Sequence, residues 1–151
     1  MRRKDREISN ADQIEAILND GLVCHLGMFD GELPYVVPLN YGYQDGYLYF
    51  HSAGEGRKVD IIRSSGYVCF QIETDLKLVK AERASGWSMK YRSVMGYGHI
   101  EELSSDEERL KALLIIMKHY SGSSEWELSA EELRNVLVLR LRVEEITGKK
   151  S

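Results

Sequence analysis

The sequence predicts a mainly β fold, a barrel of about six antiparallel strands with peripheral helices. Short apolar runs that alternate with polar residues are separated by Asp-Gly pairs, the chemistry of tight hairpin turns. A long Tyr-, Val- and Ile-bearing run over residues 86–103 contains Gly96 and Gly98, which mark a bend or bulge that would let a sheet curl. Because closure removes exposed sheet edges, we expect a small barrel. A chain of 151 residues needs only one domain, 1–151.

The composition limits the possible partners. Hydrophobic residues make up 43% and charged residues 29%, which is typical of a soluble globular protein. The formal net charge is −4 and the cations are scattered among carboxylates, so the chain lacks the continuous basic face that nucleic-acid binding requires. The basic residues 1–7 precede no apolar signal segment, and no apolar run is long enough to span a membrane. We therefore expect a cytoplasmic protein.

The two cysteines do not indicate a metal or redox site. Cys24 and Cys69 lie in separate strand-like apolar runs, and neither belongs to a Cys-x-x-Cys pair. We expect buried free thiols and no metal site. Pairing of the two strands would nevertheless bring the thiols near each other.

The first part of the chain predicts a helix and then three consecutive antiparallel strands. Asn10 is a typical helix N-cap and Gly21 a typical terminator, which bounds an amphipathic helix over residues 10–20. The expected strands are 22–29, 33–43 and 47–52, with turns at Asp30-Gly31 and Asp45-Gly46.

The second part predicts further strands with helices between them. A helix of about two to three turns should follow Gly56 and stop near Gly66. Ser105 and Glu108 form a capping box for a later helix that ends at Ser121-Gly122. Its apolar face is expected to comprise Leu110, Leu113, Leu114, Met117 and Tyr120. The remaining elements are strands over 67–73 and 136–146, one or two strands over 86–103, and a short helix around 129–133.

Strand alternation predicts which side chains fill the barrel. Leu48 and Phe50 should point inward, together with Val68, Phe70 and Ile72 of a neighbouring strand. Alternation places Tyr47, Tyr49 and His51 on the opposite face. Because large apolar patches are rare on monomers, we expect a second copy of the chain to cover that face.

The most distinctive segment is residues 47–58, an apolar strand that runs into a hydroxyl, two glycines and two cations. The hydroxyl of Ser52 precedes Gly54 and Gly56, which let the backbone approach an anion, and a helix beginning there offers unpaired N–H groups at its positive end. Arg57 and Lys58 add formal charge. The pattern predicts a phosphate-binding cradle, and the alternative is a surface loop with two solvated cations.

Several segments, in this order, resemble the FMN-binding split barrel of the pyridoxamine 5′-phosphate oxidase-like superfamily, in particular its branch related to nitroimidazole-resistance proteins. These segments are residues 1–8, 34–41, 49–58, 90–98 and 146–149. The resemblance spans almost the whole chain. It implies a six-stranded antiparallel split β-barrel that forms a homodimer, with two FMN sites at the interface, each built from both chains.

The resemblance also implies a role for each candidate site residue. The backbone of Val37, Pro38, Leu39 and Asn40 would run along the isoalloxazine edge, although Pro38 would equally suit any edge strand. The ribityl chain and phosphate would lie beside His51, Ser52 and Ala53, and the phosphate would be neutralised by Arg57 and Lys58. Tyr91, Arg92 and Ser93 would approach from the partner subunit. Alternation puts Tyr91 and Ser93 on one face and Arg92 on the other, so the three cannot all contact one ring through side chains.

The implied activity is reduction of nitroaromatic compounds by an FMN-dependent oxidoreductase, with His51 close to flavin and substrate. Oxidation of pyridoxamine 5′-phosphate is disfavoured, because the C-terminal third lacks the expected basic and aromatic constellation. Either Lys90 or Arg92 could stabilise a reduced flavin. The alternative is a non-catalytic split barrel that holds flavin or haem, or one whose cradle takes only an inorganic anion.

Overall fold

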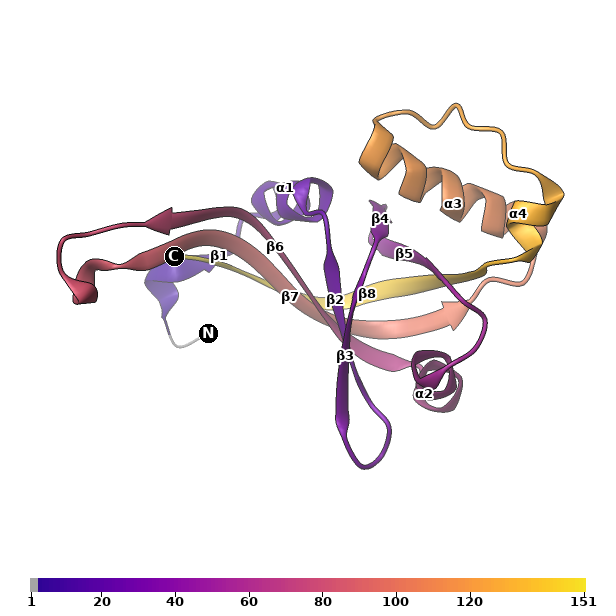
Figure 1. Ribbon diagram of the computed structural model, residues 1–151, viewed down its shortest axis with the longest axis horizontal. Helices are drawn as coiled ribbons and strands as arrows, with labels where there is room; N and C mark the ends of the chain where they lie inside the picture. Colours follow the sequence, from indigo (N-terminus) through magenta and orange to yellow (C-terminus); the bar gives the residue numbers. More distant parts are fainter. Residues whose placement is uncertain (1–2) are drawn as a thin grey trace.

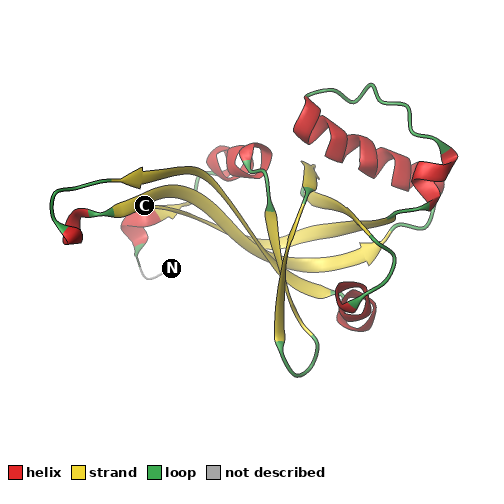
Figure 2. Ribbon diagram, viewed as in Figure 1, coloured by secondary structure: helices red, strands yellow, loops and turns green. Residues whose placement is uncertain are grey.

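The computed structural model describes residues 3–151 and contains one antiparallel sheet of eight strands. The strand order is β3-β2-β6-β7-β8-β5-β4, and β1 pairs with β8 outside this path (Figure 1). The strands are β1 (Glu7–Ile8), β2 (Cys24–Phe29), β3 (Pro34–Leu39), β4 (Tyr41–Gln44), β5 (Tyr47–Ser52), β6 (Tyr67–Val79), β7 (Ser88–Glu102) and β8 (Leu137–Lys150). The helices are α1 (Ala11–Asp20), α2 (Arg57–Ser65), α3 (Asp106–Ser121) and α4 (Ala130–Arg134), with 3₁₀ turns at Lys4–Arg6 and Ala84–Gly86. The helices lie around the sheet (Figure 2).

The mainly β class is confirmed, but the strand count and the closure differ from the prediction. The expected strand 33–43 is divided at Asn40 into β3, which pairs with β2, and β4, which pairs with β5. Within residues 3–151 no ladder joins β3 to β4, so closure of a barrel by hydrogen bonds is not detected. The two ends of the strand order are instead joined covalently through Asn40, and the sheet must curl to bring them together.

Local signals set the turns and helix ends as expected. Asp45 and Gly46 both have positive φ, 51° and 81°, and form the two-residue turn between β4 and β5. Asn10 accepts a hydrogen bond from the N–H of Gln13, and Ser105 accepts one from Glu108. The Asp30-Gly31 turn is longer than a two-residue turn, because Phe29 pairs with Pro34.

The core of the sheet forms where alternation predicted it. Leu48, Phe50, Val68, Phe70 and Ile72 are all buried in one cluster. Helices α1 and α2 contribute to this cluster through residues such as Ile17, Leu18, Ile61 and Ile62. Burying these side chains is the main stabilising contribution to the fold.

The expectation that a second copy covers Tyr47, Tyr49 and His51 is corrected for the two tyrosines, which pack against the same chain, whereas His51 stays exposed. Helix α3 of the same chain packs against β4, β5 and β8, and Tyr49 is buried in a second cluster with Val138 and residues of α3. Gly42 allows this close approach, because a Cβ there would lie 2.8 Å from the backbone of Ile115. Helix α3 therefore covers the part of this face that carries Tyr49.

The prediction for the buried face of α3 is also wrong, because the face that packs on the sheet is rotated by part of a turn from the predicted one. The buried residues are Ala112, Ile115 and Ile116. The predicted residues Leu110, Leu113, Leu114 and Met117 are only half-buried. Tyr120 instead makes polar contacts: its hydroxyl accepts from the N–H of Tyr41 (3.1 Å) and donates to the Leu22 carbonyl (2.8 Å).

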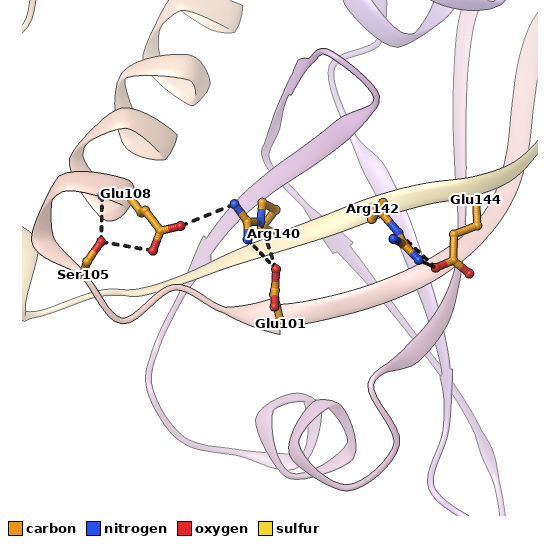
Figure 3. A network of polar contacts seen from close by, with 6 residues as sticks. All are labelled: Glu101, Ser105, Glu108, Arg140, Arg142 and Glu144. Carbon is orange, nitrogen blue, oxygen red and sulfur yellow. Dashed lines mark hydrogen bonds and ion pairs between the residues drawn. The ribbon is translucent and has the colours of Figure 1, made fainter.

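A polar network fixes the start of α3 over the sheet (Figure 3). Arg140 on β8 donates to Glu101 on β7 at 2.6 Å and to Glu108 on α3 at 3.5 Å. Glu108 also accepts a hydrogen bond from the Ser105 hydroxyl at 3.0 Å. The network therefore joins two strands to the capping box of the helix.

Strand β6 is longer than the expected 67–73, whereas β7 lies within the expected 86–103, and together they form an arm that extends away from the rest of the sheet (Figure 1). The pairing shifts between Thr74 and Lys77 and continues through Lys77 and Lys90 to Val79 and Ser88. The arm exposes Leu76, Leu78, Trp87 and Met89. At the other end of β7, the predicted bulge is confirmed as a register shift between Tyr97 and Gly98.

The two cysteines are free, and the strands that carry them pair with each other. Cys24 is opposite Ile72, whereas Cys69 is opposite Gly27. Cys24 is therefore buried on the inner face, and Cys69 is half-buried on the outer face. Among residues 3–151, no helix is both long and apolar enough to cross a membrane.

Candidate functional site

The predicted cradle lies where β5 ends and α2 begins. Gly56 has a φ of 109°, and its carbonyl accepts hydrogen bonds from the N–H groups of Val59 (2.8 Å) and Asp60 (3.1 Å). The N–H groups of Arg57 and Lys58 have no acceptor among the described residues. The positive end of the helix therefore offers free donors.

The cradle is open on its glycine side. An added Cβ at Gly54 or at Gly56 would meet no other atom within 4 Å. Both glycines are exposed, so an anion could approach the backbone directly. The Ser52 hydroxyl donates to the Ala53 carbonyl at 2.7 Å, which leaves its oxygen lone pairs available.

The two cations of the cradle differ in their partners. The Arg57 Nη2 donates to Asp30 Oδ2 at 2.6 Å, and its guanidinium lies 4.7 Å from the centre of the Tyr35 ring. Lys58 makes no ion pair with any described residue. It is half-buried, and burial lowers the pKa of its amine. A partly desolvated cation without a partner is suited to a bound anion.

Asp30 is strongly held in its charged form. Its Oδ1 accepts the N–H groups of Glu32 (2.9 Å) and Leu33 (2.8 Å), and its Oδ2 faces Arg57. The backbone hydrogen bonds from Leu33 and Glu32, together with the bond from Arg57, lower the pKa of Asp30 to about 2. Sequence reasoning treated Asp30 only as a turn residue and did not single out Tyr35.

The segment Val37 to Asn40 lies on and just beyond β3, at one end of the strand order. Pro38 is therefore on an edge strand, where a missing N–H is tolerated. Pro38 and Asn40 are exposed, whereas Val37 and Leu39 are half-buried against the core. The free edge of β3 leaves backbone groups without a ladder partner.

His51 is exposed near the end of β5, opposite Val138 of β8. Alternation puts it on the outer face together with Tyr49, as predicted. Because α3 covers Tyr49 but leaves His51 exposed, this imidazole lies at the rim of the helix-covered region, next to the cradle.

The structure does not bring Tyr91, Arg92 and Ser93 to the cradle of the same chain. They lie on β7 beside the C-terminus, because the N–H of Ser151 donates to the Tyr91 carbonyl at 3.1 Å, and Figure 1 shows the C-terminus well to the left of α2. Arg92 forms ion pairs with Asp75 and, at 3.7 Å, with Asp20. The Lys149 amine lies 5.8 Å from the centre of the Tyr91 ring. The predicted division into Tyr91 and Ser93 on one face and Arg92 on the other fits these contacts.

His25 is not among the residues predicted for the site, but the strand register places it beside the predicted cofactor segment. His25 on β2 is directly opposite Pro38 on β3. Its Nδ1 lies 3.8 Å from Glu73 Oε2, and both atoms are buried without a hydrogen-bond partner. The pair of His25 and Glu73 depends on the register of β2 and β6, which cannot be predicted without the fold.

The antiparallel sheet with its few helices matches structures of the split-barrel class. A family profile described as pyridoxamine 5′-phosphate oxidase matches residues 10–150. The chain therefore belongs to the pyridoxamine 5′-phosphate oxidase family. A search of proteins with curated functions finds no match.

Solved structures agree with this assignment. A candidate 5-nitroimidazole antibiotic resistance protein from Bacteroides thetaiotaomicron is 36% identical, with a TM-score of 0.84, over 95% of this chain and 86% of that chain. An FAD-binding protein from Mesorhizobium loti is 25% identical, with a TM-score of 0.71, over 97% of each chain. An FAD- and haem-binding protein from Mycobacterium smegmatis shares the fold, with 16% identity and a TM-score of 0.84, over 97% of this chain and 73% of that chain.

Proposed function

We propose that the protein is an FMN-dependent oxidoreductase that reduces nitroaromatic, 5-nitroimidazole-like compounds. The observation that carries this proposal is the cradle at the start of α2, where free N–H groups, two open glycines and the unpaired Lys58 suit a phosphate monoester. The similarity to the candidate nitroimidazole-resistance protein supports the choice of substrate class.

Different residues around the cradle would contact different parts of the cofactor. Arg57 and Lys58 would neutralise the phosphate, with Ser52 and Ala53 beside it. The isoalloxazine would lie along Val37, Pro38, Leu39 and Asn40. The contact of Arg57 with Tyr35 supports this arrangement, because it shows that the cradle and β3 are neighbours.

A bound flavin would accept a hydride or electrons from a reduced donor and pass them to the acceptor. The protein would supply position and hydrogen bonds. His51 is the proposed catalytic residue, because an exposed imidazole beside the cradle can donate an N–H to a nitro oxygen of the acceptor.

The site would be completed by a second copy of the chain. Tyr91, Arg92 and Ser93 lie on the arm, far from the cradle of their own chain (Figure 1). They could therefore contribute only to the cradle of another subunit, which is consistent with the proposed homodimer. Lys90 and Arg92 share one face of the arm, but the ion pairs of Arg92 with Asp20 and Asp75 leave Lys90 as the freer cation.

Cofactor binding is the first test. We expect purified or reconstituted protein to show the visible absorbance of bound FMN and to quench the fluorescence of added FMN. Replacing both Arg57 and Lys58 by alanine should weaken FMN binding by at least tenfold, since a hydrogen bond to a charged group contributes about 1.5–3 kcal/mol. Colourless protein that leaves FMN fluorescence unchanged would contradict the proposal.

Catalysis requires a second experiment. The FMN-loaded protein should be reduced anaerobically by a nicotinamide donor and reoxidised by a nitroaromatic acceptor. His51→Ala should slow the reoxidation while FMN remains bound. Tight flavin binding without reoxidation by any acceptor would identify a flavin carrier, and preferential binding of FAD or haem would contradict the choice of cofactor.

A further inference from the structure

The β2–β3 turn is connected to the start of α2 by one side chain. Arg57, the first residue of α2, reaches Asp30, which is distant in sequence, at 2.6 Å. The same guanidinium lies 4.7 Å from the centre of the Tyr35 ring on β3. Arg57 therefore connects the cradle to the strand that continues into Val37–Asn40.

Both groups that contact Arg57 are themselves held in place by other contacts. Asp30 accepts two backbone N–H groups of its own turn, at 2.8 and 2.9 Å, so its carboxylate is fixed relative to β2 and β3. Tyr35 is half-buried and packs against the core cluster. A long arginine side chain that would otherwise sample many rotamers is thus held at one place.

These contacts leave most of the donors of Arg57 free. Asp30 receives a hydrogen bond from Nη2 only, while Nε and Nη1 have no partner among residues 3–151. A guanidinium carries five N–H donors in a rigid plane, so it can hold Asp30 at one edge and a phosphate at another.

We propose that Asp30 and Tyr35 are positioning residues that hold Arg57 for the cofactor phosphate. They thereby fix the spacing between the phosphate cradle and the β3 segment Val37–Asn40. This inference rests on the proposed function, since it requires a phosphate in the cradle. It assigns a role in ligand binding to a turn residue and to a tyrosine that precedes the predicted contact segment.

A positioning role of Asp30 and a simple effect of its charge predict opposite changes in the affinity for FMN. Asp30 places a negative charge beside the cradle, so on charge alone Asp30→Asn should tighten the binding of a phosphate dianion. If Asp30 acts by holding Arg57, the same variant should weaken binding. Asparagine retains an acceptor for the N–H groups of Glu32 and Leu33, so the turn itself is preserved.

The test compares FMN with riboflavin, which lacks the phosphate, by fluorescence titration of the full chain. We expect Asp30→Asn to weaken FMN binding about fivefold, in line with the upper range for exposed ion pairs. Riboflavin binding should stay within about twofold of the wild-type value. Tyr35→Leu should weaken FMN binding about threefold, and Tyr35→Phe, which keeps the aromatic face, should restore it.

Glu144→Gln is the matched control. Arg142 forms a similar surface ion pair with Glu144 at 2.6 Å, but Arg142 lies opposite Tyr47 at the start of β5, whereas the cradle follows the end of that strand. This variant should leave FMN affinity unchanged.

Each other outcome contradicts the inference. Unchanged or tighter FMN binding by Asp30→Asn would show that Asp30 does not position Arg57. An equal loss of riboflavin binding would show a general disturbance of β3. If wild-type protein binds riboflavin as tightly as FMN, the proposed phosphate cradle itself fails, and this result is separate from any behaviour of the Asp30 variant.

Discussion

The outer face of the sheet has two halves that differ in how they are covered. Over β4, β5 and the first part of β8, helix α3 packs on the sheet and Tyr49 is only 9% exposed. Over β3, β2, β6 and β7, outward-facing apolar side chains remain accessible, including Val36 at 62% and Met95 at 44%. One chain therefore covers one half of its outer face and leaves the other open.

This contrast bears on where the proposed second copy of the chain would pack. The pleat alone predicted outward apolar residues, and Tyr47 and Tyr49 were assigned to a dimer contact that α3 occupies. The open half carries Pro38 and continues into the arm with Tyr91 and Ser93. The proposed dimer is therefore better placed on the open half, beside the residues attributed to the flavin site.

The largest expected effect is a difference between the two halves in how much a substitution lowers the free energy of unfolding. Ile116→Ala removes a buried side chain beneath α3 and should lower the free energy of unfolding by about 2–5 kcal/mol. Val36→Ala, on the open half, should lower it by less than about 0.5 kcal/mol at protein concentrations where the chain is monomeric. Urea unfolding monitored by circular dichroism measures both, and similar losses would contradict the division.

The second prediction concerns association. Met95→Glu places a charge on the open half and should shift a dimer to monomer, observed by light scattering after size-exclusion chromatography. Leu114→Glu, on the half-buried side of α3, is the control and should leave the dimer intact. If only the α3 variant dissociates the dimer, the dimer contact lies on the half covered by α3 and not on the open half.

The smallest effect is on thiol chemistry. Burial raises the pKa of the Cys24 thiol, so this residue should react with a maleimide only after unfolding. Cys69 is half-buried on the open half and should react in the native protein. If a second copy covers this half, its labelling should slow as protein concentration rises. Equal rates for Cys24 and Cys69 in native protein would be the contrary result.

The features that were predictable depend on residues close together in sequence. Asn10, Ser105 and the Asp45-Gly46 turn act on their nearest neighbours, and each was identified correctly. The start of α2 after Gly56 was also predictable from a local pattern, as was the alternation that buries Leu48 and Phe50.

The features that were missed depend on contacts between distant residues. The division at Asn40 follows from β3 and β4 pairing with different strands, and nothing in the apolar run itself interrupts it. The buried face of α3 is set by the close packing of its backbone on Gly42, where the space between helix and strand leaves no room for a side chain. The partners of Arg57 and His25 likewise exist only once the strands are in register.

The position of β8 affects the order in which the protein can fold. This strand pairs with β7 on one side and with β5 and β1 on the other, yet the ribosome makes it after all three. Until β8 emerges, β5 and β7 each lack a neighbour and present unpaired backbone edges. The sheet can therefore be completed only when synthesis has passed residue 150, and a nascent chain halted before residue 137 should depend on chaperones to avoid aggregation.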